Sequence, residues 1–597
     1  MMKRLFLGIV LMLATVAVRA ARAYSEPFVV NQPDGTQLTL VLNGDEHMSW
    51  LTTSDGTIVM KTPQGYCVAS IDDNGGLVAS HLVAHQPVQR TAEEQQVCQL
   101  QQQRRSLFFQ QVNTTWNAVR RAQVTGKNYF PHSGSPKCLV ILAQFSDYPF
   151  TSDNPKAQFE QYINGDVQED MGHKEDKNLV SVKKYFEQSS QGQFTPQFDV
   201  RGPVTLPQTL EYYGKNQGKT KDVNFTQFCK DAIAAVDDEV DFKNYDNDND
   251  GDAELVCIIF AGYGENVSGN PAETIWPKCS SNYHETNDGV IVNYVNCGAE
   301  LYKKANSTDI NGIGVFCHEF SHGMGLPDLY ATSEDTYINN QSPEFFDLMD
   351  YGEYAANGYA PVPYSVWEQE AMGWIEVEQL TDSQTGIELT PLVKGGKAYK
   401  FGNSTNSNEW IMIENVQKAR SDENRTLGFP YGHGLLVWHI AYKSDVVNMV
   451  DYPNRIALKP RVCIVPADKE VINGYLIGNS YSSDEYKASL KGDPFPGTSE
   501  VKALTPELSL PNYKFYNDFD YNDDDEVPQY KLTDIKEESG VVTFNFVNIA
   551  TDVKAIIDHH DTLAADYYTL EGRSMGRDYH RLPKGIYVRN GMKVIKK

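Results

Sequence analysis

Positive charge is scarce in this sequence, and the shortage limits which partners the protein can bind. Its 52 lysines and arginines face 79 aspartates and glutamates, which gives a formal net charge of −27 and an isoelectric point near 4.9. A surface of this sign repels phosphate groups, so we expect no nucleic acid and no anionic membrane surface as a partner. Apolar residues are not scarce, because a hydrophobic fraction of 41% is enough for packed cores and excludes global disorder.

Long apolar runs are missing after residue 23, which excludes a transmembrane helix in that part of the sequence. The one such run covers residues 5–18 and follows Lys3 and Arg4. Small residues suited to signal-peptide cleavage come next, at Ala20 and again at Ala23. The sequence therefore predicts a secretory signal over residues 1–23 and a protein that is secreted or held at the cell surface.

A disulfide framework is missing as well. Nine cysteines are spread over 597 residues without regular spacing, and an odd count leaves at least one thiol unpaired in a monomer. Cys279 and Cys297 flank a polar loop and form the one pair that we consider for a disulfide. Cys67 lies in a strand-like run, which favours a buried thiol over a thiolate that blocks a metal.

The most informative stretch is Cys-His-Glu-Phe-Ser-His-Gly-Met-Gly-Leu-Pro-Asp at residues 317–328. His318 and His322 are four residues apart and share one face of a helix, where two imidazoles can bind one zinc ion. Glu319, beside the first histidine, is placed to act as general base on a metal-bound water. A glycine after the second histidine can end the helix and return Asp328 as an oxygen ligand. Three protein ligands leave a fourth position open, which indicates a catalytic rather than a structural zinc site.

The context of this motif decides between a zinc site and a chance match, because a bare His-Glu-x-x-His arises by chance in long proteins. The segment Phe-Asp-Leu-Met-Asp-Tyr-Gly at residues 346–352 follows the motif. It looks like the methionine turn that runs beneath the zinc in metzincin-type peptidases, with Met349 as a soft apolar floor. Together with the glycine and aspartate at fixed offsets, this turn favours catalytic zinc.

A second acidic segment precedes the zinc motif. Asp246, Asp248, Asp250 and Asp252 stand at alternate positions around a glycine, as in a calcium-binding loop. The twelfth position, where a complete EF-hand has a carboxylate, is Cys257. A calcium loop and a solvated acidic turn are both open interpretations, and we favour calcium because clustered carboxylates without a cation would repel one another.

The order of patterns along the chain predicts an α+β protein with several domains. Short strands between Asp-Gly turns, then a Gln- and Arg-rich helical stretch, suggest a small β-rich propeptide with a linker over residues 24–130, and the alternative is a permanent N-terminal domain. Residues 131–384 would form a zincin-like or metzincin-like catalytic domain, in which strand 254–262 is the rim that a substrate joins as an added strand. Strand and turn patterns predict an all-β, sandwich-like domain over residues 385–549 and a small separate tail over residues 550–597.

With these residues in hand, the chain resembles the immune inhibitor A family of secreted zinc metallopeptidases. The resemblance rests on His-Glu-Phe-Ser-His-Gly-Met-Gly-Leu-Pro-Asp-Leu-Tyr at residues 318–330, on the segment at 346–352, and on further blocks in the same order between residues 25 and 548. An aspartate stands as third ligand where most metzincins carry histidine. The last forty-odd residues resemble the C-terminal tails of exported Bacteroidetes proteins, which leaves a sorting role and an ordinary β module both open.

The resemblance implies a secreted zymogen with a catalytic zinc ion and calcium-stabilised loops. Carried over position by position, it implies zinc ligands, a general base, a methionine turn and a tyrosine that hydrogen-bonds the tetrahedral oxyanion. These are, in order, His318, His322 and Asp328, then Glu319, Met349 and Tyr351.

The hypothesis is therefore a monomeric, exported zinc endopeptidase that cleaves proteins or peptides and is inhibited by its own propeptide. A peptidase-like surface binding protein is one alternative, and it is disfavoured because every catalytic position is filled. A zinc amidase that acts on cell-wall peptides is the other, and the sequence leaves it open.

Overall fold

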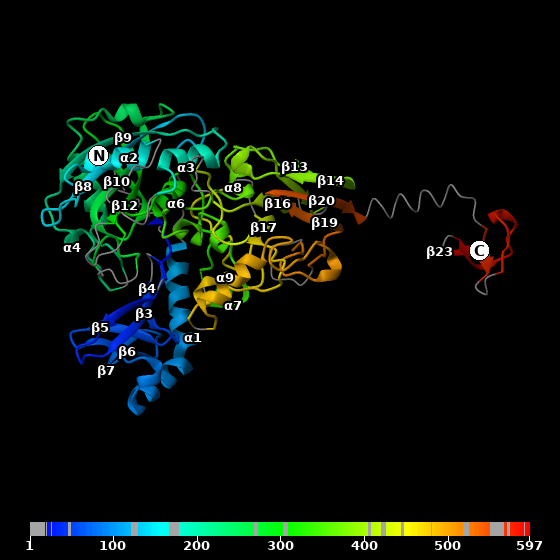
Figure 1. The fold of residues 1–597 in the computed structure, drawn as a ribbon, viewed down its shortest axis with the longest axis horizontal. Helices are drawn as coiled ribbons and strands as arrows, with labels where there is room; N and C mark the ends of the chain where they lie inside the picture. Colours follow the sequence, from blue (N-terminus) through cyan, green and yellow to red (C-terminus); the bar gives the residue numbers. More distant parts are fainter. Residues whose placement is uncertain are drawn as a thin grey trace, which may run out of the picture.

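The computed structural model shows an elongated molecule in which a small N-terminal sheet and a long helix lie below a larger body (Figure 1). The described residues are 18–19, 21–25, 27–45, 49–120, 129–165, 178–218, 220–267, 273–302, 309–332, 334–403, 408–419, 425–442, 447–478, 480–516, 525–549, 566–569, 573–589 and 592–596. None of the helices within these ranges is both long and apolar enough to cross a membrane.

The N-terminal sheet has six antiparallel strands that follow one another in sequence order, as short strands joined by tight turns do. Its strands are β2 Phe28–Asn31, β3 Gln37–Gly44, β4 Ser49–Thr53, β5 Ile58–Thr62, β6 Gly65–Ile71 and β7 Leu77–Val83. After the short helix η1 (Pro87–Gln89), helix α1 (Ala92–Arg120) lies against this sheet. The Gln101 amide joins helix and sheet, because it donates to the carbonyls of Ile58 and Ala69 and accepts from the Ile58 amide. The strands and the helix predicted for this region are thus present.

The central sheet has six strands in the order β1-β11-β12-β10-β8-β9. Strands β9, β8, β10 and β12 are parallel, whereas β11 is antiparallel to β12 and β1 is antiparallel to β11. Their bounds are β1 Val18–Arg19, β8 Lys137–Gln144, β9 Gln197–Thr205, β10 Asp252–Tyr263, β11 Lys278–Glu285 and β12 Ile291–Leu301. Alternate residues of β8 enter two different cores, so both faces of the parallel part are buried, as its continuous apolar pattern requires.

Helices cover both faces of this sheet. Helix α6 (Ile313–Gly323) packs into one core and α5 (Phe225–Ala234) into the other. The remaining helical elements of this half are α2 Pro155–Asn164, α3 Val182–Ser189, α4 Leu210–Tyr213, η2 Phe242–Tyr245, α7 Glu334–Asn339, η3 Glu344–Phe346, η4 Tyr351–Tyr354 and α8 Val366–Ala371.

The strand predicted to form the rim of the cleft is not at the edge. Strand β10 lies inside the sheet between β12 and β8, and β11 is the strand to which the N-terminal β1 adds. That part of the prediction is wrong because a strand with a long apolar run, here residues 255–261, belongs in the sheet interior, where both its edges and both its faces are covered.

The C-terminal half contains two sheets that share one core, with a small third sheet after them. The five-stranded sheet β13-β15-β16-β17-β18 packs against the three-stranded sheet β14-β20-β19. Their strands are β13 Glu378–Gln379, β14 Gln384–Leu389, β15 Tyr399–Gly402, β16 Glu409–Val416, β17 Gly434–Ala441, β18 Val462–Ile464, β19 Tyr530–Glu538 and β20 Val541–Asn548. The helical elements here are η5 Leu392–Lys394, η6 Gly474–Leu476, α9 Ser483–Gly492, η7 Pro506–Leu508 and η8 Tyr579–Arg581, and the last sheet is β21 Tyr568–Thr569, β22 Gly585–Arg589 and β23 Met592–Lys596.

Two features add to the all-β, sandwich-like domain predicted for residues 385–549. Helix α9 is present, and it begins with a capping box in which Ser482 and Glu485 satisfy each other's backbone amides. The other face of the five-stranded sheet, including Met412 and Trp438, packs into the same core as α6. The β-rich part is therefore attached to the half that contains α6 by a continuous hydrophobic core.

Candidate metal centre and active site

Helix α6 is buried along its whole length, and its two histidines face one carboxylate. His318 Nε2 lies 3.3 Å and His322 Nε2 3.2 Å from the same Oδ1 atom of Asp328. The helix ends at Gly323, and Gly325, whose φ of +100° would strain any other residue, turns the chain back toward the histidines. The structure thus brings together the three side chains that the sequence predicted as metal ligands.

Hydrogen bonds fix the tautomer of both histidines. His318 Nδ1 donates to the carbonyl of Leu348 over 3.0 Å, and His322 Nδ1 donates to the carbonyl of Leu326 over 2.7 Å. Both Nε2 atoms are left with lone pairs directed at Asp328, the arrangement that metal-binding histidines adopt. The backbone carbonyls therefore orient the ligands before any metal is bound.

The three side chains fit a divalent metal ion. Their ligand atoms lie within 4.8 Å of one another, and neither Nε2 atom has a hydrogen-bond partner among the described residues. Burial would raise the pKa of Asp328, but the adjacent His322 and His318 outweigh it and hold that pKa well below its usual range. Two imidazole nitrogens and a carboxylate oxygen form the donor set that zinc accepts.

Glu319 is wholly buried beside these ligands. Its Oε1 atom accepts a hydrogen bond of 2.5 Å from the backbone nitrogen of Ala21, a residue of the N-terminal segment. Burial raises the pKa of the Glu319 carboxyl well above its usual range. A carboxyl group beside the ligands is positioned to carry a proton to an amide nitrogen.

The segment predicted as a methionine turn lies under the metal centre. Met349 is wholly buried, and its carbonyl accepts a hydrogen bond of 2.9 Å from the amide of Leu329, next to Asp328. The preceding carbonyl, of Leu348, is the one that holds His318. The backbone at Leu348 and Met349 therefore contacts both ends of the metal centre, His318 through one carbonyl and the neighbour of Asp328 through the other.

Tyr351 has a different environment from the one expected of an oxyanion donor. Its hydroxyl donates to the Ser25 hydroxyl over 3.1 Å, and its ring packs on the guanidinium of Arg22. Tyr354, which sequence reasoning did not single out, donates a hydrogen bond of 2.5 Å to the Arg22 carbonyl. In this structure Tyr354 is thus the tyrosine whose hydroxyl contacts the backbone of the segment in the cleft.

A buried carboxylate behind the metal centre also escaped the sequence reasoning. Glu353 Oε2 lies 3.8 Å from His318 Nδ1, and burial raises the pKa of this carboxyl to about 8. The start of α6 touches the same element, because a Cβ on Gly314 would lie 1.8 Å from the Glu353 carbonyl oxygen. The signal was present in the sequence, since an acid four residues after the turn methionine stands among aromatic and small residues.

The predicted calcium loop is only partly assembled. The carboxylates of Asp246, Asp248 and Glu254 lie within 4.8 Å of one another, so the third acid comes from β10. Asp250 Oδ1 instead accepts from the Asp252 amide, and Asp252 Oδ2 accepts from the Asn293 amide. The calcium interpretation stays a prediction for Asp246 and Asp248.

The predicted disulfide is absent, because all nine cysteines are free and buried. Cys279 and Cys297 lie on the paired strands β11 and β12, but the register places Cys297 opposite Lys278. An offset of one residue sends the two side chains to opposite faces of the sheet and into different cores. Cys67 is buried within the N-terminal sheet beside Thr62, in the strand-like run where we expected it.

A buried His-Glu-x-x-His helix with a returning aspartate over a methionine turn defines a metallopeptidase-type metal centre. Residues 129–375 match the family model described as immune inhibitor A peptidase M6, catalytic domain, which confirms the resemblance to the immune inhibitor A family for this part of the chain.

Two curated relatives agree with this match. The pre-pro-metalloprotease PrtV of Vibrio cholerae serotype O1 (strain M66-2) is 25% identical over 299 residues, which cover 43% of this chain and 32% of the relative. Immune inhibitor A of Bacillus thuringiensis subsp. alesti is 25% identical over 275 residues, 39% of this chain and 39% of the relative. The chain thus spans about a third to two fifths of the length of these relatives.

Proposed function

We propose that this protein is a zinc-dependent endopeptidase, exported and made as a latent precursor. The observation that carries the proposal is the convergence of His318, His322 and Asp328 on one point beside Glu319. Zinc bound by these three residues would supply Lewis-acid activation of a water molecule and of the scissile carbonyl. The match to a peptidase M6 catalytic domain over residues 129–375 supports the same class of reaction.

Glu319 handles the proton in this reaction. Its carboxylate accepts a proton from the attacking water and then gives it to the amine that leaves, so that the peptide bond is replaced by a carboxylate and an amine. The Ala21 nitrogen on Oε1 occupies the place of such an amine. Glu319 is therefore the residue whose removal should stop hydrolysis without removing the metal.

A peptide substrate would bind as an additional strand on β11. Strand β1 of the N-terminal segment already pairs there, with Val18 opposite Ser280 and Arg19 opposite Cys279. Backbone pairing of this kind holds any extended peptide, whatever its side chains, which suits an endopeptidase. The same observation supports latency of the chain that still carries residues 18–19, because the protein's own chain then lies in the position that a substrate needs.

The proposal is tested by digestion of denatured casein with the secreted protein after limited trypsin treatment. We expect digestion by the wild type, its loss on zinc chelation and its recovery on zinc addition. Glu319→Ala should be inactive, and Glu211→Gln, an exposed carboxylate on α4, serves as the matched control. No digestion by a trimmed, zinc-loaded wild type would overturn the endopeptidase proposal.

A further inference from the structure

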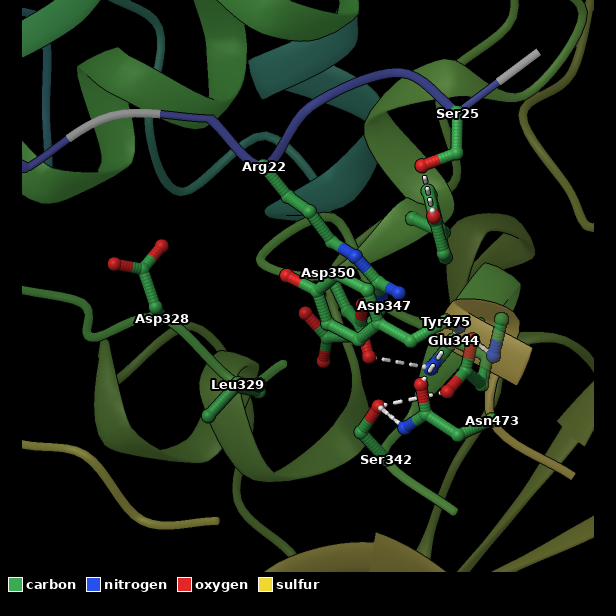
Figure 2. A network of polar contacts seen from close by, with 12 residues as sticks. Arg22, Ser25, Asp328, Leu329, Ser342, Glu344, Asp347, Asp350, Asn473 and Tyr475 are labelled. Carbon is green, nitrogen blue, oxygen red and sulfur yellow. Dashed lines mark hydrogen bonds and ion pairs between the residues drawn. The ribbon is translucent and has the colours of Figure 1, made fainter. Parts of the chain in front are cut away.

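We propose that the active site contains a subsite for an arginine side chain, two residues after the scissile bond, which Arg22 fills in the chain that is uncut or is cut at Ala20. This inference rests on the proposed peptidase function and names the substrate class of that site. Figure 2 shows the Arg22 side chain leaving the N-terminal segment and entering a group of polar residues around Asp350, Glu344 and Tyr475, apart from Asp328.

The backbone of the segment sets the register. The Ala21 nitrogen lies on Glu319, the residue that would protonate the leaving amine, so Ala21 takes the place of the first residue after the scissile bond. The next two carbonyls are held by side chains of the cleft, since Trp276 Nε1 donates to the Ala21 carbonyl over 3.0 Å and Tyr354 donates to that of Arg22. These bonds bind main chain only, so a substrate peptide could form the same ones.

The Arg22 side chain, by contrast, is recognised by its chemistry. It is wholly buried, and its guanidinium carbon lies 3.7 Å from the Tyr351 ring centroid and 3.3 Å from that of Tyr475. Two rings this close to one atom flank the planar group, and aromatic faces attract a cation. A flat, weakly hydrated guanidinium fits between them better than the compact, strongly hydrated ammonium of lysine.

Negative charge completes the subsite. Arg22 Nη1 lies 3.3 Å from Asp350 Oδ1, and Glu344 stands next to Asp350, because the Glu344 amide donates to Asp350 Oδ2 over 2.8 Å. All three side chains are wholly buried. Two carboxyl groups kept from water favour a cation that neutralises them, which gives the subsite a physical reason to select a basic residue.

The shape of the subsite is fixed by residues from three segments. Glu344 accepts hydrogen bonds from Ser342, Tyr486 and the Gly474 amide, which hold its carboxylate in place. A Cβ at Gly474 would lie 2.4 Å from the Tyr351 ring, so only glycine leaves room for the ring that stacks on the guanidinium. The subsite is thus held by the packed body, and Tyr475 also packs in one core with Trp50 and Phe108 of the N-terminal sheet and helix.

The test uses the secreted protein after limited treatment with immobilised trypsin, which is then removed. The substrates are fluorogenic peptides with the sequence of residues 18–25, with glutamine in place of Arg19, and with arginine, lysine or leucine at the position of Arg22. Glu319→Gln protein treated in parallel reports any trypsin left behind. We expect kcat/KM for the arginine peptide to exceed that for the leucine peptide at least tenfold, with the lysine peptide between them.

The variants separate a subsite from a structural role. Asp350→Asn and Tyr475→Leu should each reduce the ratio of arginine to leucine cleavage toward one, whereas Asp153→Asn, an exposed carboxylate, should keep the wild-type ratio. A wild-type ratio near one would overturn the subsite. Equal losses of arginine and leucine cleavage in Asp350→Asn, with the ratio unchanged, would also overturn it.

A second readout keeps the subsite distinct from the peptidase proposal. Binding of the same peptides to trimmed, zinc-loaded Glu319→Gln protein is measured by fluorescence polarisation, which needs no catalysis. Tighter binding of the arginine peptide than of the leucine peptide supports the subsite even if casein is not digested. Equal binding overturns it even if casein is digested.

Discussion

The metal centre and the Arg22 subsite are both buried groups of acids and cationic or metal-binding side chains, but their residues come from very different distances along the chain. The three ligands of the metal centre all lie within residues 318–328, where one helix and one turn set their spacing. The subsite joins Arg22, Glu344, Asp350 and Tyr475. The first can be recognised in a sequence, whereas the second exists only once the N-terminal segment, the methionine turn and a loop of the β-rich half are packed together.

The largest effect is expected at the metal centre. Asp328→Ala removes one of three ligands, so zinc content should fall from about one per chain to near zero and casein digestion should disappear. Metal analysis of the purified protein checks this, with Asp153→Ala as control. Full zinc content in Asp328→Ala would show that Asp328 is not a zinc ligand.

The next largest effect is expected for Glu319→Gln, which separates metal binding from catalysis. The amide keeps the shape but cannot take a proton, so kcat should fall by about 10²–10⁴ while zinc content stays at the wild-type value. Zinc analysis and casein digestion on one preparation measure both quantities. Loss of zinc together with activity would contradict the assignment of Glu319 as general base.

Asp350→Asn tests the other site in untreated protein that still carries Arg22. It leaves the buried Arg22 cation with less compensation, and removing one partner of a buried ion pair costs about 3–5 kcal/mol. Urea unfolding should show this loss, with zinc content unchanged. Arg22→Met added to Asp350→Asn should recover part of the stability, because the uncompensated cation is then gone. Equal stability of the wild type and Asp350→Asn would mean that the ion pair contributes nothing to docking of the segment.

A smaller effect should follow pH at the Arg22 subsite. Burial, and the nearby Asp350, raise the pKa of Glu344 to about 7, with Arg22 and the hydroxyls of Tyr486 and Ser342 acting against them. Below that pH the carboxyl gains a proton and loses the charge that attracts arginine. The ratio of arginine to leucine cleavage should therefore decrease a few-fold from pH 8 to pH 6, and Glu344→Gln should make it independent of pH. A ratio that increases toward low pH would contradict the charge argument.

The smallest effect is expected from Cys67→Ser. Its thiol is buried in β6 beside Thr62, so it does not reach the metal, and the segment around Ala21 covers Glu319 instead. Latency of the precursor, measured as casein digestion before trypsin treatment, should be unchanged. Arg22→Leu is the informative partner, because it should increase that basal digestion. Casein digestion by untreated Cys67→Ser protein would instead show that the Cys67 thiol blocks the metal centre.

Local patterns predicted much of the fold because they depend on neighbours in sequence. The periodicity of residues 313–323 and the histidine spacing identified α6, and apolar runs identified β8 and β10. Strand order does not follow from such patterns, so β10 was misplaced at the edge and the polar β11 was read as a loop. The same limit explains Cys279 and Cys297, whose separation across a sheet depends on a register of one residue.

By itself, the sequence determined the metal centre, since helix geometry alone places His318 and His322 on one face and a glycine turn returns Asp328. It also indicated the class of metal centre through the motif and the segment around Met349. Only the tertiary structure decided what lies in the cleft and what surrounds Arg22. Contacts between residues hundreds of positions apart depend on how whole elements pack, and no local pattern carries that information.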